Sequence, residues 1–229
     1  MPSQFSTFNE KSLHASLKRW YAGADDQFEQ PVGRYVIDIV QPQRLVESQT
    51  RSFASMKGKL TELLETHVVR LVHPIAQEKW LVKLAADQLT EESRRKSPKR
   101  GSLLNLFAEL VSFPALINHP NFSLEILLIR EEELRRHEEG KAWRRGGWVT
   151  HERKLLGVVE QHVFHNASDL QALLPSELNA TFTSAELAKA LGCPRRLAQQ
   201  MIYCLHKMEA IQEAGKRGRA KLYQSVPLL

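Results

Sequence analysis

Apolar positions along residues 1–140 recur with two periods, which predict alternating helices and strands. Apolar residues three and four positions apart predict amphipathic helices, at 12–21, 53–64 and 103–111. Runs of β-branched and aliphatic residues predict strands, at 35–40, 45–49, 69–72, 80–84 and 124–129. A charged run follows the last of these strands. The whole pattern predicts an α/β domain built on a mixed sheet.

Beyond residue 140 the period becomes mainly helical, and an apolar stripe predicts a helix over 151–165. Thr183 and Glu186 form a capping box, in which each side chain satisfies the other residue's backbone amide at the start of a helix. Pro194 stands where a second helix can begin, because the first residues of a helix need no intrahelical amide bond. Two short strands around a glycine-rich basic tip follow. We therefore predict a mostly helical C-terminal domain.

The stretch 138–147 combines glycines and charges with a change in composition, which is typical of a linker. It predicts two domains, with boundaries 1–140 and 141–229.

The net charge is unevenly distributed between these two parts. Residues 1–140 contain 19 Lys and Arg against 19 Asp and Glu, while residues 141–229 contain 13 against 7, which is the whole formal charge of +6. A positive excess gathered in one segment is typical of a protein that binds a phosphate backbone, with simple solvation as the alternative.

Composition also limits the protein class. No apolar stretch reaches the roughly 18 residues of a membrane span, and the N-terminal segment lacks the apolar core of a secretion signal. The two cysteines, Cys193 and Cys204, lack the spacing of a metal site and predict buried free thiols. These features predict a cytoplasmic protein with no membrane partner.

The two predicted C-terminal helices, joined by a tight turn and followed by a basic two-stranded tip, resemble the winged-helix superfamily. The resemblance implies that the second helix contacts base edges or phosphates and that the tip contacts phosphates. The candidate DNA-binding residues are Arg195, Arg196, Gln199, Gln200, Lys216, Arg217, Arg219 and Lys221. A winged helix that contacts protein is the alternative.

A second basic cluster surrounds a Ser-Pro turn near residues 94–100. It is either a DNA-backbone contact or a solvated loop, and it contains Arg94, Arg95, Lys96, Lys99 and Arg100.

Carboxylates on two predicted strands carry the catalytic hypothesis. Asp38 is the one charge within residues 36–40, and its burial would be costly without a cation or hydrogen-bond donors. Glu47 and Gln49 share one face of the next strand. If the two strands are neighbours, Asp38 and Glu47 can converge on one divalent ion, and Mg²⁺ prefers such oxygen ligands.

The order of helix, strand with Asp38, strand with Glu47 and Gln49, helix and strand resembles the PD-(D/E)xK nuclease superfamily of restriction enzymes and Holliday-junction resolvases, over residues 10–84. The resemblance implies that Asp38 and Glu47 bind Mg²⁺ or Mn²⁺, with help from Glu10. It implies that Gln49 replaces the usual lysine and orients the attacking water, while Lys57 or Lys59 supplies positive charge. The sequence departs from the family pattern in this missing lysine and in having no proline before Asp38.

Each of these residues also has a structural interpretation. Glu10 completes a capping-box pattern with Thr7, and Lys57 and Lys59 fit the solvated face of a helix. Asp38 could instead pair with an arginine, for which Arg34, Arg51 and Arg70 are the candidates.

The resulting functional hypothesis is a metal-dependent endonuclease that acts on double-stranded or branched DNA, for example in DNA repair. A homodimer would suit double-strand cleavage, since two strands need two sites. The alternatives are a DNA-binding regulator whose nuclease-like domain is inactive, and an RNA-processing or protein-interaction adaptor.

Overall fold

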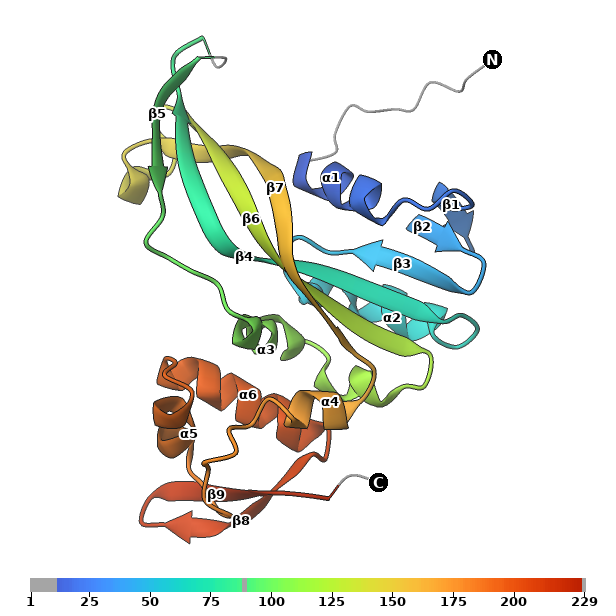
Figure 1. The fold of residues 1–229 in the computed structure, drawn as a ribbon, viewed down its shortest axis with the longest axis vertical. Helices are drawn as coiled ribbons and strands as arrows, with labels where there is room; N and C mark the ends of the chain where they lie inside the picture. The colour runs from blue at the N-terminus through green and yellow to red at the C-terminus, as the bar shows by residue number, and fades with distance from the viewer. Residues whose placement is uncertain (1–11, 88–89, 228–229) are drawn as a thin grey trace. The chain divides into compact units, whose positions relative to one another are not determined.

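The computed structural model describes residues 12–87 and 90–227. Its main feature is a seven-stranded mixed sheet in which the hydrogen-bonded order is β1-β2-β3-β4-β6-β7, with β5 paired to β4 (Figure 1). The strands are β1 (Gln27–Val32), β2 (Tyr35–Gln41), β3 (Arg44–Ser48), β4 (Val69–Leu84), β5 (Glu91–Lys96), β6 (Phe122–His137) and β7 (Trp148–Phe164). The chain divides into two compact units, each described below by itself. The first contains 74–102, 127–161 and the residues up to 26, and the second contains 27–73, 103–126 and 162–229.

In the second unit, β1, β2 and β3 form an antiparallel meander, and β3 pairs in parallel with β4. A parallel pair needs a crossover connection, and here it consists of the 3₁₀ helix η1 (Phe53–Met56) and the helix α2 (Lys57–Leu63). Alternation along β2 buries Ile37 and Ile39 and places Asp38 on the other face. The strands and the helix predicted in this region are confirmed, whereas β1 was not predicted.

Short helices follow in the same unit and pack through aromatic rings. They are η2 (Leu103–Asn105), α3 (Leu106–Leu110) and η3 (Pro114–Asn118). Phe113, just before η3, stacks on Phe53 with ring centroids 5.4 Å apart. The helix predicted over 103–111 is thus confirmed, with its first turn in 3₁₀ form.

The first unit contains α1 (Ser12–Tyr21), which the sequence predicted, and stretches of strand that are longer than the sequence predicted. The two strands predicted at 69–72 and 80–84 are one strand, β4, and the charged run after residue 129 continues β6 to His137. β6 can carry so many charges because neighbouring strands neutralise them. Buried Glu131 lies 2.9 Å from Lys79 of β4 and 2.6 Å from Arg153 of β7.

The prediction of a helix over 151–165 is wrong, because residues 151–164 belong to the 17-residue strand β7. Leu156 and Val159 belonged to the supposed buried stripe, yet they are 46% and 39% exposed. The stretch 138–147 is the turn between β6 and β7 rather than a linker, and the predicted boundary at 140/141 lies in it. The turn includes η4 (Trp143–Arg145) and exposes 80% of Trp143.

The predicted fold class therefore needs correction. Residues 141–229 are not a mostly helical domain, since they contain strands of 17, 7 and 6 residues beside α-helices of 5, 7 and 13. The chain has a mixed α/β fold that the seven-stranded sheet dominates.

The last part of the second unit has the predicted two helices and hairpin (Figure 1). Its elements are α4 (Ala167–Gln171), α5 (Ser184–Ala190), α6 (Arg195–Lys207), β8 (Ile211–Arg217) and β9 (Ala220–Ser225). The capping box of Thr183 and Glu186 opens α5, and Gly192 turns the chain with a φ of 59°. Phe182 bridges to Tyr223, so a third short segment joins the β8–β9 hairpin.

Both cysteines are free thiols, as predicted, but only Cys204 is buried, whereas Cys193 is partly exposed. Within residues 12–87 and 90–227, no helix has the length and apolar character needed to cross a membrane.

Candidate functional site

Asp38 and Glu47 face each other on adjacent antiparallel strands. The β2–β3 register pairs Ile39 with Val46, which sets Asp38 opposite Glu47, and opposite residues of such a pair point to the same face. The backbone amide of Asp38 donates to Oε1 of Glu47 at 3.3 Å. The two carboxylates therefore come together, as the strand pattern predicted.

Asp38 is held in place by the residue that follows Glu47. The backbone amide and the hydroxyl of Ser48 both donate to Oδ2 of Asp38, at 2.8 and 2.9 Å. Of its suggested arginine partners, Arg34 pairs with Glu62 and Arg70 pairs with Glu125. Ser48 was not singled out from the sequence, because its role depends on the pairing of the two strands.

Lys59 of α2 brings a positive charge to the pair. Its Nζ lies 2.7 Å from Oε1 of Glu47 and donates to the carbonyl of Val36 at 2.7 Å. Both side chains are largely buried, with 16% of Lys59 and 5% of Glu47 exposed. Lys59 is therefore part of the carboxylate cluster, and its interpretation as a purely solvated lysine is wrong.

Burial and like charge both act on Glu47. Burial is the larger cause that raises the pKa of its carboxyl, and the neighbouring charge of Asp38 raises it further, while Lys59 opposes both. The cluster thus holds two carboxylates close enough to repel each other, with one ammonium that compensates in part.

The other residues predicted for this site are Gln49, Lys57 and Glu10, of which the structure describes the first two. Gln49 follows β3, and its side-chain amide bonds to Ser55 at 3.3 Å and to the backbone of Arg51 at 3.0 Å. Lys57 is exposed one turn before Thr61, which bonds to its carbonyl. Glu10 lies outside the described residues. Within the described ranges, no group of three or more His, Cys, Asp or Glu side chains could hold a metal ion.

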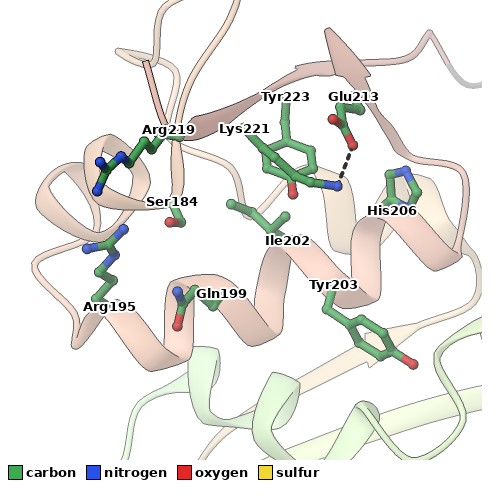
Figure 2. Close-up of a pocket in the computed structure, with 11 residues that line it drawn as sticks. Ser184, Arg195, Gln199, Ile202, Tyr203, His206, Glu213, Arg219, Lys221 and Tyr223 are labelled. Atoms are coloured by element: carbon green, nitrogen blue, oxygen red, sulfur yellow. Dashed lines mark hydrogen bonds and ion pairs between the residues drawn. The ribbon is translucent and has the colours of Figure 1, made fainter. Parts of the chain in front are cut away.

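A second feature is a hollow of about 420 Å³ between α6 and the β8–β9 hairpin. Arg195 and Gln199 line it from α6, and Arg219 and Lys221 line it from the hairpin (Figure 2). Lys221 also pairs with Glu213 at 2.8 Å. The structure thus brings together four of the residues predicted to bind DNA.

The other four residues predicted there lie outside the lining of this hollow. Arg196 and Lys216 are exposed, Gln200 is half-buried, and Arg217 pairs with Glu186 of the capping box at 2.6 Å. Tyr203 of α6, which the sequence analysis did not select as a site residue, is 46% exposed and points away from the hairpin (Figure 2).

Comparison with known proteins identifies the family. The model of a domain of unknown function, DUF8091, matches residues 11–165. The chain belongs to this family. The match includes Asp38, Glu47 and Lys59 and ends before α4. An uncharacterized protein of Treponema pallidum (strain Nichols) is 28% identical over 230 residues, which is 97% of this chain and 88% of that protein. No solved structure matches.

The basic cluster near residue 94 lies within the DUF8091 match and is partly neutralised. Arg94 pairs with Glu132 at 2.7 Å and Lys96 pairs with Glu78 at 2.7 Å, and both cations lie over the ring of Trp80. Arg94–Lys96 belong to β5 rather than to a turn, while Lys99 and Arg100 follow it. All five side chains, with Arg95 among them, are exposed.

Proposed function

We propose that the chain is a metal-dependent deoxyribonuclease in which Asp38, Glu47 and Lys59 form the reaction site. The observation that carries the proposal is the facing carboxylate pair with the lysine 2.7 Å from Glu47. The order of α1, β2, β3, α2 and β4 agrees with the order on which the resemblance to the PD-(D/E)xK nucleases rests, and β1 is an additional strand before β2. The position of Lys59 supports it as the source of the positive charge that Gln49 cannot supply.

The donor set fits Mg²⁺ or Mn²⁺. Asp38 and Glu47 offer hard oxygen ligands from neighbouring strands. Burial first and the charge of Asp38 second raise the pKa of Glu47, and a cation would relieve the repulsion between the two carboxylates. A bound ion would lower the pKa of a coordinated water and screen the charge that develops on the phosphate.

The protein's own residues would prepare the site in three ways. Ser48 fixes the orientation of Asp38 through two hydrogen bonds, and Glu47 is fixed by the amide of Asp38. Lys59 would stabilise the negative charge that grows on the phosphate oxygens, which is an electrostatic contribution of the kind that dominates catalysis in many enzymes. Burial around Glu47 keeps these charges poorly screened by water.

The resemblance of the C-terminal part to winged helices supports DNA as the substrate. α5 and α6 with the β8–β9 hairpin, bridged to Phe182, have the order of elements that the resemblance rests on. The hollow lined by Arg195, Gln199 and Arg219 offers donors to phosphates and base edges. A cytoplasmic location would be compatible with a DNA substrate, and a homodimer would give two sites for two strands.

A cleavage assay tests the proposal. The full chain is incubated with supercoiled, linear, branched and single-stranded DNA in Mg²⁺ or Mn²⁺, with a chelator as the control. We expect cleavage that needs the metal. Binding without cleavage in either metal would contradict the nuclease, and binding restricted to RNA would favour an RNA-processing adaptor.

The second candidate is a DNA-binding regulator whose nuclease-like part is inactive. The observation in its favour is that Gln49 stands where the family has lysine and bonds to Ser55 and Arg51. Such a regulator would bind DNA with the same affinity with or without metal, and the assay above separates the two candidates.

The hairpin tip provides a test of DNA binding that does not depend on cleavage. Lys216→Gln removes one exposed charge, so the plot of log affinity for duplex DNA against log salt should become shallower by about 1. Lys221→Gln is the matched control, because Glu213 already neutralises Lys221 and a smaller change is expected. Fluorescence anisotropy at several salt concentrations measures both slopes, and equal slopes for all three proteins would contradict a role for the tip.

A further inference from the structure

A second hollow in the same compact unit lies between α2, the segment around η3, and α6. Its volume is about 610 Å³, within the range of small-ligand sites. Lys57 and Thr61 line it from α2, residues 111–120 contribute most of its wall, and Tyr203 and Lys207 line it from α6. Tyr203 also lines the hollow beside the hairpin, so the two hollows meet at this residue.

The walls of this hollow are tied to one another by direct contacts. Asn118 donates to the carbonyl of Met208 at 3.1 Å, which joins η3 to the end of α6. Glu109 of α3 accepts from the amide of Phe53 at 3.2 Å, and Phe53 stacks on Phe113 in the wall. The segments that carry the walls of the hollow are therefore fixed relative to one another before a ligand enters.

The lining combines positive charge with apolar and aromatic surface. Lys57, Lys207 and His119 are its basic side chains, and among the described residues that line it none carries a carboxylate. Phe113, Leu116 and two prolines give it an apolar wall. A ligand that matches this lining has a flat apolar body and a negatively charged group.

We propose that this hollow receives one unpaired nucleotide of a DNA substrate. The base would stack on the ring of Tyr203, which Figure 2 shows directed away from the hairpin, and the flanking phosphates would pair with Lys57 and Lys207. Aromatic side chains bind bases of any sequence in this way because every base offers a π face. The inference rests on the proposed function and deepens it, since it names DNA with an extrahelical base as the substrate class.

The position of the hollow links the two parts of the proposed enzyme. Lys57 and Lys59 lie on one helix, and Lys59 contacts Glu47. Tyr203 and Lys207 lie on the helix that carries Arg195 and Gln199. A strand held at the hairpin could thus pass Tyr203 and continue along α2 towards the carboxylate pair within this one unit.

A fluorescent base tests the proposal. The probe is a DNA duplex with a single-nucleotide bulge of 2-aminopurine, compared with the same duplex fully paired, and a chelator prevents cleavage. We expect the full chain to bind the bulged duplex more tightly and to quench the 2-aminopurine. Tyr203→Ala should reduce affinity for the bulge about tenfold and abolish the quenching, while Tyr203→Phe should keep both.

The controls separate the hollow from general DNA binding. Lys57→Gln and Lys207→Gln should weaken binding of the bulged duplex, whereas Lys189→Gln, an exposed lysine of α5 outside both hollows, should not. Equal affinity for the two duplexes, or full quenching by Tyr203→Ala, would overturn the nucleotide pocket even if the chain cleaves DNA. Quenching by a chain that never cleaves DNA would support the pocket and refute the nuclease.

Discussion

Glu47→Gln is expected to lower metal-dependent DNA cleavage by about 10²- to 10³-fold and to leave DNA binding unchanged. The substitution keeps the shape of the side chain and removes the charge that would hold the ion beside Asp38. It also removes the partner of Lys59, whose Nζ lies 2.7 Å from the carboxylate. Single-turnover cleavage at saturating protein measures the loss, and anisotropy in chelator measures binding.

The two lysines of α2 provide the matched control for this experiment. Lys59 contacts Glu47, whereas Lys57 is exposed and lines the hollow between α2 and α6. Lys59→Gln should therefore lower the cleavage rate about 10²-fold on any DNA, and Lys57→Gln should leave the rate on fully paired duplex unchanged. Equal rates for Lys59→Gln and the unchanged protein would refute the role proposed for Lys59.

Glu131→Ala is expected to lower the free energy of unfolding by about 3–5 kcal/mol. Glu131 is fully buried and lies between two cations, 2.9 Å from Lys79 and 2.6 Å from Arg153. Removal of the shared carboxylate would take one counter-charge from two cations whose side chains are only 26% and 25% exposed, so their charge would be poorly screened by water. Urea unfolding followed by circular dichroism measures the change.

The adjacent residue of β6 gives the control. Glu132 pairs with Arg94 at 2.7 Å, but 45% of the Arg94 side chain is exposed. Glu132→Ala should therefore change the free energy of unfolding by less than about 1 kcal/mol. A loss for Glu131→Ala as small as that of Glu132→Ala would contradict the structural importance of the buried charges.

The same network explains how a strand can have so charged a sequence. Burial opposes ionisation of Glu133, but hydrogen bonds and charge from Lys79 and Arg135 prevail and lower the pKa of Glu133 to about 2. The charged run therefore belongs to the sheet up to His137, because Glu131, Glu132 and Glu133 each pair with a cation on β4, β5, β6 or β7. The sequence pattern alone does not reveal Lys79 as a partner, since it lies 54 positions from Glu133 along the chain.

The excess of positive charge is also distributed along the chain differently from what the predicted domain boundary suggests. Residues 141–165 contain five basic and two acidic residues, and residues 166–229 contain eight and five. Half of the net charge of +6 thus lies on the β6–β7 turn and β7 rather than on the two C-terminal helices and their hairpin. The whole-segment count overstated the charge available for DNA binding at that hairpin.

The sequence by itself determined the features that depend on neighbouring residues. The capping box at Thr183, the helix α1, the turn at Gly192 and the strands around Asp38 and Glu47 follow from local hydrogen bonding, backbone preference and apolar period. Only the tertiary structure decided that residues 151–165 form a strand, because its cross-strand partners outweigh a weak helical period. It alone decided that Lys59 reaches Glu47 and that Tyr203 and Lys57 line one hollow. These side chains come from different elements of the fold, so their meeting depends on strand register and helix packing.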